Sequence, residues 1–196
     1  MTASPRRRDA AATRQAILAS ARKAFARAGY DGVGVREIAA GAGVTAMLVN
    51  RYFGSKEKLF EEVAIDLARD AVILSPENLA APDFAVALAR SLVEVTAPGA
   101  TPLDGFQMML RSSGSPKAVE LGRDLIRRGN QATLLQRIEG PGAEARAGVF
   151  LALVAGLQIM RQTMELPSLA EADPAELARL LEPVIRALMV EGAKEA

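Results

Sequence analysis

Residues 35 to 60 constrain the fold of this chain most, because their pattern predicts two short helices joined by a tight turn. Val35 and Ile38 recur at the spacing that buries one face of a short helix. Gly43 suits the left-handed backbone position after a helix end, and Thr45 suits the N-cap of the next helix. Two helices joined in this way form the helix-turn-helix, whose second helix commonly enters the DNA major groove.

Charge is distributed unevenly along the chain. Residues 1 to 58 contain 11 Lys and Arg against 4 Asp and Glu, a net charge of +7, whereas the remaining residues carry a net charge of −6. A basic segment can neutralise phosphates and release counterions, so this polarity favours DNA binding over an ordinary helical hairpin. We expect residues 1 to 12, with Arg6, Arg7 and Arg8, to form a flexible basic arm, which either reaches DNA or is only a solvated tail.

Residues 13 to 60 resemble the DNA-binding domain of the tetracycline-repressor (TetR) family of bacterial transcriptional regulators. The matching segments are Thr13-Arg14, Ile17-Leu18, Phe25, Gly29-Tyr30, Val35 to Ala39, Ala42 to Thr45, Arg51 to Phe53 and Ser55 to Glu57. The resemblance implies an all-α fold with a three-helix DNA-binding domain over residues 13 to 60 and the helix-turn-helix at about 35 to 54. It also implies a helical ligand-binding and dimerisation domain over residues 61 to 196.

The second helix of the motif departs from the family pattern. Ala46 stands where a basic residue is common, and Asn50 replaces the usual Tyr. Met47 and Leu48 can contact thymine methyl groups, and the Asn50 amide can pair with adenine. We expect DNA contacts from Arg36, Thr45, Ala46, Met47, Leu48, Asn50, Arg51, Tyr52 and Lys56. The departures leave open an alternative, a helical small-molecule-binding or scaffold protein that no longer reads DNA.

Composition argues against an enzyme. The chain has no His and no Cys, which excludes Ser-His-Asp catalysis, His-ligated zinc and disulfides. The acidic residues Glu61, Glu62, Asp66 and Asp70 follow helical spacing and indicate a solvated face. We therefore expect no catalytic residue, no metal and no cofactor. The apolar segment 147 to 160 is too short to cross a membrane, so we expect a cytoplasmic protein without a membrane partner.

Pro and Gly divide the rest of the chain into helices, about nine in all. The helix expected over residues 143 to 165 is apolar nearly all round, and the last helix carries a broad apolar stripe. Such helices need cover on more than one side, so we expect a homodimer built from both helices and their symmetry mates, rather than a monomer that buries them itself. The expected interface residues are Phe150, Leu153, Val154, Leu157, Leu177, Leu181, Val184 and Leu188.

Ligand sensing follows from the resemblance, which implies a regulator released from a palindromic operator by a small molecule. Phe and Met side chains with a few polar groups on the middle helices suit an apolar pocket, although such residues also serve as plain packing. The expected ligand-binding residues are Phe84, Phe106, Gln107, Met109, Leu110, Arg111, Gln158 and Met160. Because Trp, Cys and His are absent, the expected effector is small and apolar.

Overall fold

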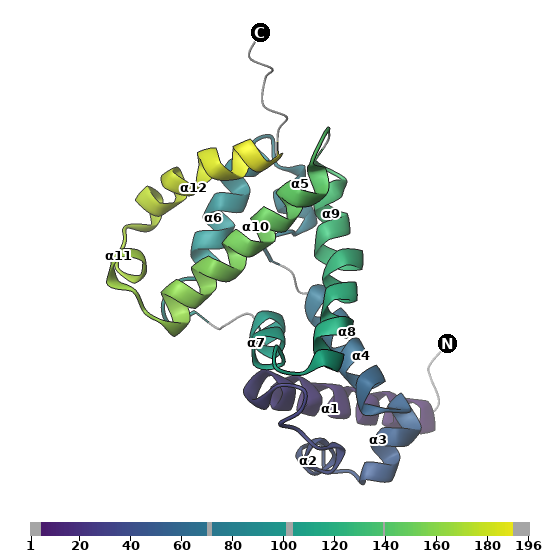
Figure 1. Ribbon diagram of the computed structural model, residues 1–196. Helices are drawn as coiled ribbons and strands as arrows, with labels where there is room; N and C mark the ends of the chain where they lie inside the picture. Colours follow the sequence, from purple (N-terminus) through teal and green to yellow (C-terminus); the bar gives the residue numbers. More distant parts are fainter. Residues whose placement is uncertain (1–4, 70–71, 101–103, 139, 190–196) are drawn as a thin grey trace. The chain divides into compact units, whose positions relative to one another are not determined.

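The computed structural model describes residues 5–69, 72–100, 104–138 and 140–189, and every regular element among them is helical (Figure 1). These residues form eleven continuous helices when the joined segments 116–135 and 143–163 are each counted as one helix. Nine correspond to the expected helices, and the additional two are α5 (Pro76–Ala80) and α11 (Pro167–Ala170). Both begin at a proline and last about one turn, too short to give a helical apolar repeat. The all-α fold class is confirmed.

The chain forms two compact units. The first unit comprises Met1–Arg69 together with Asp104–Leu125, and the second comprises Asp70–Leu103 together with Ile126–Ala196. We expected one boundary at residue 60, but the compact first unit extends past it and takes in a separate later segment. That segment joins the first unit because its apolar side chains, including Met108 and Ala118, belong to the same core as those of the N-terminal helices.

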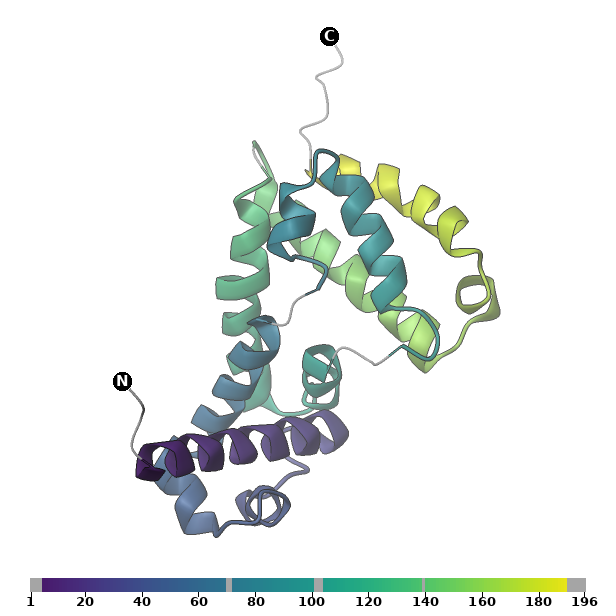
Figure 2. The same ribbon diagram turned by 180° about the vertical axis from the view of Figure 1, so that it is seen from behind.

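Six helices build the first unit, all of them visible in Figures 1 and 2. They are α1 (Pro5–Ala28), α2 (Val35–Gly41), α3 (Ala46–Phe53), α4 (Lys56–Arg69), α7 (Asp104–Arg111) and α8 (Pro116–Ile126). We expected a flexible arm over residues 1 to 12, yet α1 begins at Pro5. Proline suits the first position of a helix, and the Ala-rich segment that follows favours helix, so the arm expectation does not hold for residues 5 to 12. Residues 1 to 4 lie outside the described residues.

Three aromatic rings form the centre of the first unit's core. Phe25 and Tyr30 each place their ring centroid 5.1 Å from that of Phe60, in edge-to-face geometry. Ile38 of α2 and Val49 of α3 are buried in the same core. The helix-turn-helix is thus held by side chains that point away from its outer surface, which leaves that surface free for other contacts.

Helix α7 is attached closely to the end of α1. The Ser112 hydroxyl accepts a hydrogen bond from the Tyr30 N–H (2.9 Å) and donates one to the Met108 carbonyl (2.6 Å). Gly29 has φ +69°, and a Cβ on it would overlap the carbonyl oxygen of Arg111. The glycine is therefore required twice, once for its backbone conformation and once because the two helix ends approach so closely.

The second unit is built around α6 (Phe84–Val95), α10 (Ala143–Gln158) and α12 (Pro174–Met189). The short elements α5, η1 (Arg127–Gln131), α9 (Ala132–Leu135) and α11 surround them, and the π-helical turn η2 (Ile159–Thr163) continues α10. Leu88, Phe150 and Ile185, one from each main helix, are fully buried in a shared core. The Asp83 carboxylate caps α6 and forms an ion pair with Arg186 (2.6 Å), which links α12 to the start of α6.

The helix formed by α10 and η2, Ala143–Thr163, is long and apolar enough to cross a membrane, with a mean hydropathy of 1.4 over its most apolar window. We expected no such stretch, because the uninterrupted apolar run ends before Arg161; a single Arg does not lower the mean hydropathy enough to exclude the helix. Only 22% of that window is buried inside the unit. An apolar core helix of a soluble protein meets the same criterion, so one such helix is weak evidence for a membrane.

Candidate functional site

The candidate site of the first unit is the outer face of α3. Thr45 caps the helix, because its hydroxyl accepts a hydrogen bond from the Leu48 N–H (3.3 Å). Gly43, at φ +67°, makes the turn before it, and Gly54, at φ +80°, ends it. Val49 and Phe53 are buried and fix the rotation of the helix about its axis. The remaining side chains of α3 are consequently directed outward in a defined order.

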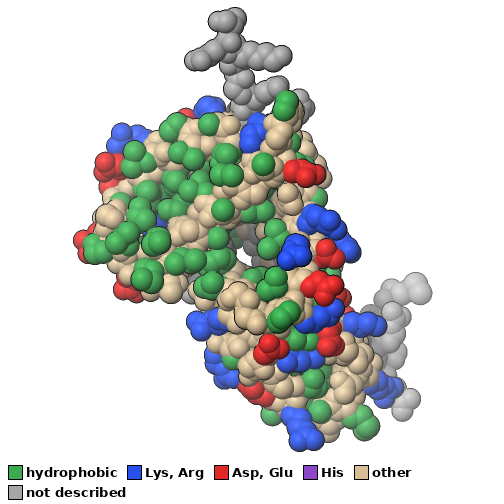
Figure 3. Space-filling model, viewed as in Figure 1, with side chains coloured by type: hydrophobic (Ala, Val, Ile, Leu, Met, Phe, Trp, Pro, Cys, Tyr) green, Lys and Arg blue, Asp and Glu red, His purple; other side chains and the backbone are tan. Residues whose placement is uncertain are grey.

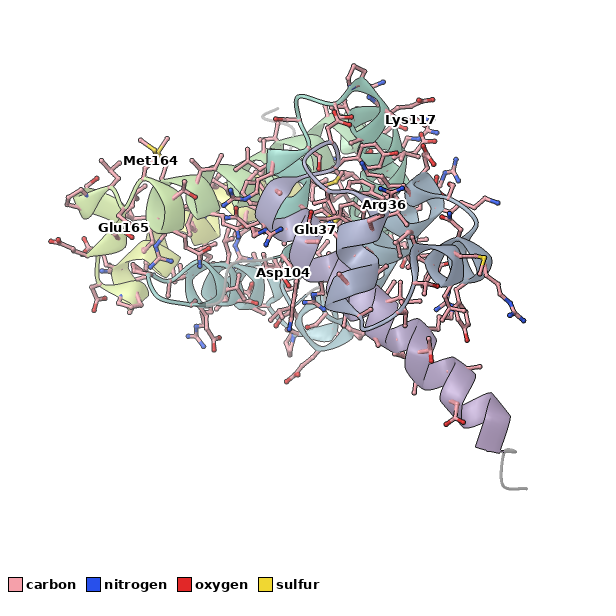
Figure 4. The ribbon with its side chains drawn as sticks, turned by 90° about the horizontal axis from the view of Figure 1, so that it is seen from below. Arg36, Glu37, Asp104, Lys117, Met164 and Glu165 are labelled. Carbon is pink, nitrogen blue, oxygen red and sulfur yellow. The ribbon has the colours of Figure 1, made fainter. Side chains whose placement is uncertain are left out.

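The expected DNA-binding residues fall into two groups. The side chains of Arg36, Thr45, Met47, Asn50 and Arg51 are exposed, and Met47, at 80%, is the most exposed large apolar side chain among the described residues. Arg36 projects from α2 beside Glu37 (Figure 4), and the latter forms an ion pair with Arg27. The second group is half-buried and comprises Ala46, Leu48, Tyr52 and Lys56.

Lys56 and its neighbours form a small network at the start of α4. The Lys56 ammonium lies 4.3 Å from the centroid of the Tyr30 ring, a cation–π contact that orients the lysine. Burial and a hydrogen bond with Glu57 raise the pKa of Tyr30 to about 12, so the phenol stays neutral at physiological pH. A hydrogen bond with Ser55 lowers the pKa of the Glu57 carboxyl. The cation–π contact therefore holds the Lys56 side chain at the start of α4, next to the end of α3.

The expected dimer residues divide between core and surface. Phe150, Leu157, Leu177 and Leu181 are buried within the second unit's own core, Leu153, Val154 and Leu188 are half-buried, and Val184 is 46% exposed. Sequence analysis missed the exposed residues Val149 and Leu180, of which Leu180 is 64% exposed. The spacing Leu180-Val184 gives a second row of apolar side chains on α12 beside the row through Leu177 and Leu181, but the spacing does not tell which row is buried. Figure 3 shows apolar side chains gathered over α10, α11 and α12.

The expected ligand-binding residues divide between the two units. Phe106, Gln107, Met109, Leu110 and Arg111 lie on α7 of the first unit, whereas Phe84, Gln158 and Met160 lie in the second. Met109 packs against Gly122 of α8, and Met160 is exposed.

Gln158 is fully buried, and among the described residues neither its Nε2 nor its Oε1 has a hydrogen-bond partner. A buried amide left unpaired is costly, so this side chain calls for a polar partner.

Two family profiles match this chain, one in its N-terminal third and one over most of the rest. The family profile described as bacterial regulatory proteins, tetR family, matches residues 17–63, and the one described as tetracyclin repressor-like, C-terminal domain, matches residues 83–189. The chain is 41% identical over 68 residues to the HTH-type transcriptional repressor AcnR of Corynebacterium efficiens, which is 34% of this chain and 36% of that protein. The match thus spans only about a third of the relative's length.

Solved structures match over most of the chain. A TetR-family regulator from Streptomyces coelicolor is 25% identical with a TM-score of 0.57, covering 92% of this chain and 96% of that one. GusR of Salmonella enterica is 21% identical with a TM-score of 0.70, covering 90% and 95%, a likeness that shows the fold alone. The second profile by itself spans more than half of the 196 residues. The chain belongs to the TetR family of bacterial regulatory proteins.

Proposed function

We propose that this protein is a cytoplasmic transcriptional repressor that binds a palindromic operator in double-stranded DNA as a homodimer and is released by a small apolar effector. The observation that carries the proposal is the outer face of α3, where a capped and core-anchored helix presents Met47, Asn50 and Arg51 to solvent. These three side chains supply an apolar, an amide and a guanidinium group, which suit thymine, adenine and guanine respectively. The repressor relative AcnR supports the direction of regulation.

The Lys56 ammonium supports the same interface by a different mechanism. It is held on the Tyr30 ring beside α3, where it can neutralise a backbone phosphate without reading the base sequence. Ala46 removes a basic group that is common at this position, while Arg51 and Lys56 keep two positive charges on or beside the same helix. The departures at Ala46 and Leu48 alter which sequence is read and leave the means of DNA binding intact.

The test is equilibrium binding to duplexes selected from a random library, measured by fluorescence anisotropy over a range of salt concentrations. Asn50→Ala should reduce discrimination at one base position by about 1–3 kcal/mol. Lys56→Ala should weaken binding to all sequences and lower the salt slope by about 1. Arg123→Ala, at an exposed position of α8, is the control and should do neither. If no duplex is preferred over random DNA, the protein is the alternative small-molecule-binding or scaffold protein.

The uncovered apolar surface of the second unit supports the homodimer. Val149 and Met160 on α10 and η2, with Leu180 and Val184 on α12, are large apolar side chains left at the surface. An apolar surface of this kind marks an interaction site in a soluble protein. A second copy of the same helices is the partner we propose, because a two-fold dimer holds two recognition helices one DNA turn apart. Phe150 and Leu181, being core residues, are excluded from the proposed contact surface.

The effector proposal is supported by Gln158, the buried amide without a partner. An effector that combines an apolar body with one carbonyl or amide group would satisfy it. Thermal unfolding with a series of medium-chain aliphatic ketones and amides tests this, followed by operator release with any compound that stabilises the protein. Gln158→Leu should abolish the stabilisation. Compounds that stabilise both proteins equally would show that the effector binds elsewhere.

A further inference from the structure

The groove between α6 and α12 has a buried cation at its edge. It is a hollow of about 710 Å³ whose walls are mostly small and apolar, and it is lined by Val86, Ala89, Arg90, Val93, Glu94, Ala97, Arg161, Pro174, Ala175, Ala178, Arg179 and Glu182. Its volume lies in the range of small-molecule sites. Neither Gln158 nor any other expected ligand-binding residue lines it.

Arg161 is turned inward by the backbone of η2. This π-helical turn shifts the register at the end of α10, and Arg161 is only 2% exposed while its neighbour Met160 is at the surface. The Arg161 Nη1 donates to the Val93 carbonyl (2.6 Å) and to the Thr96 hydroxyl (2.8 Å), and Nε donates to the Leu169 carbonyl (3.1 Å).

All of these acceptors are neutral. No carboxylate among the described residues forms an ion pair with Arg161, and its Nη2 donates to none of them. Burial lowers the pKa of this guanidinium, as expected for a charge taken out of water without a counter-ion. A buried cation normally has an anionic partner, because the desolvation of an unpaired charge is costly. The Arg161 guanidinium therefore lies where an anion bound in the groove would act as its counter-ion.

The rest of the groove fits an anion with an aliphatic tail. Val86, Ala89 and Ala178 form the apolar walls, and Arg90 and Arg179 add positive charge at the rim. Two acidic residues also line the groove. Glu182 is already paired with Arg186 (2.9 Å), and Glu94 is exposed on α6. The groove also shares no residue with the uncovered surface at Leu180 and Val184, since helical spacing places the two on opposite sides of the buried stripe of α12.

We propose that the α6–α12 groove is a binding site for small aliphatic carboxylates, with the carboxylate on Arg161 and the tail along the apolar walls. The site is distinct from the one proposed at Gln158, and it does not depend on DNA binding. The carboxylate replaces the missing counter-ion, and a guanidinium is the side chain best suited to it.

Isothermal titration calorimetry with octanoate, octanol and octylamine tests the head group. Octanoate should bind at least tenfold more tightly than octanol, and octylamine should not bind. Equal affinity for octanoate and octanol would overturn the proposal, because Arg161 would then contribute nothing.

Groove variants test the location. Ala175→Phe fills the groove from an exposed position and should reduce octanoate affinity at least tenfold, whereas Ser168→Phe, exposed on α11 outside the groove, should leave it unchanged. Octanoate should also shift the methyl resonances of Val86 and Ala178 in NMR spectra. Unchanged binding to Ala175→Phe, in a variant shown to be folded by circular dichroism, would place the ligand elsewhere and refute the site.

Discussion

The two units of this protein differ in how completely each covers its own apolar surface. In the first unit, hydrogen bonds as well as apolar packing hold the helices together. Ser112 accepts a hydrogen bond from the Tyr30 N–H, and Gly29 lets the end of α1 approach α7 closely. In the second, Leu180 and Val149 remain exposed beside a well-packed core. The first unit also exposes Met47 on α3 and Ile65 on α4, and it can offer single side chains of α3 to DNA. An apolar surface as exposed as that of the second unit is typical of an interaction site.

The largest effect is expected at the close contact between α1 and α7. Gly29→Ala should destabilise the protein by about 2–5 kcal/mol, because the new methyl group meets the Arg111 carbonyl and the residue must also keep φ at +69°. Gly43→Ala is the matched control, with φ +67° but no heavy atom near the new Cβ, and should cost about 1–2 kcal/mol. Urea unfolding measures both. Equal losses would mean that the α1–α7 contact is not tight.

The next effect concerns the uncovered surface. The double change Leu180→Glu with Val184→Glu should raise the dimer dissociation constant at least about 100-fold, equivalent to about 2.7 kcal/mol, because two carboxylates would be buried in the contact. Ile65→Glu, at an exposed apolar position of α4 in the first unit, should leave association unchanged. Analytical ultracentrifugation over a range of concentrations measures both. A wild-type protein that sediments as a monomer at every concentration would remove the contrast between the units.

The smallest effect separates two amides of the second unit. Gln162→Leu should cost about 1–2 kcal/mol, because its Nε2 donates to the Val95 carbonyl (3.2 Å) and the Ala97 carbonyl (3.1 Å). Gln158→Leu should cost nothing or stabilise slightly, because its buried amide has no partner among the described residues. Thermal unfolding of the ligand-free variants gives both values. A large loss for Gln158→Leu would show that the amide is satisfied, for example by bound water.

The sequence predicted the helices well where a repeat or a cap marks them. The Thr45 cap and the Gly43 turn are local features, so they could be read directly, and the structure has both. The start of α1 at Pro5 was not predicted, because the segment carries no apolar repeat. The grouping of α7 with the first unit depends on contacts between residues far apart in the chain, such as Tyr30 with Ser112, which no periodicity reveals.

For the candidate sites, the sequence told more about which kinds of side chain are present than about where those side chains lie. The sequence identified α12 as having a broad apolar stripe, but it could not separate the core side, with Leu177 and Leu181, from the surface side, with Leu180 and Val184. Only the direction from which α6 packs decides that question. The groove at Arg161 had no sequence signal, because an arginine near the end of an apolar helix acquires its meaning from the π-helical turn that buries it and from having no ion pair with a carboxylate of the described residues.

The division of the first unit into two chain segments has a consequence for how the protein can be cut or recombined. A fragment that ends near Arg69 would contain the whole helix-turn-helix, yet it would lack α7 and α8, which contribute Met108 and Ala118 to the same core. The helix-turn-helix is continuous in sequence, but the core beneath it takes side chains from two separate chain segments. Grafting these N-terminal residues onto a foreign sensor domain would require that domain to supply a substitute for α7, with a serine or an equivalent donor-acceptor group facing the Tyr30 N–H. A fusion boundary placed directly after α4 would leave this core without Met108 and Ala118.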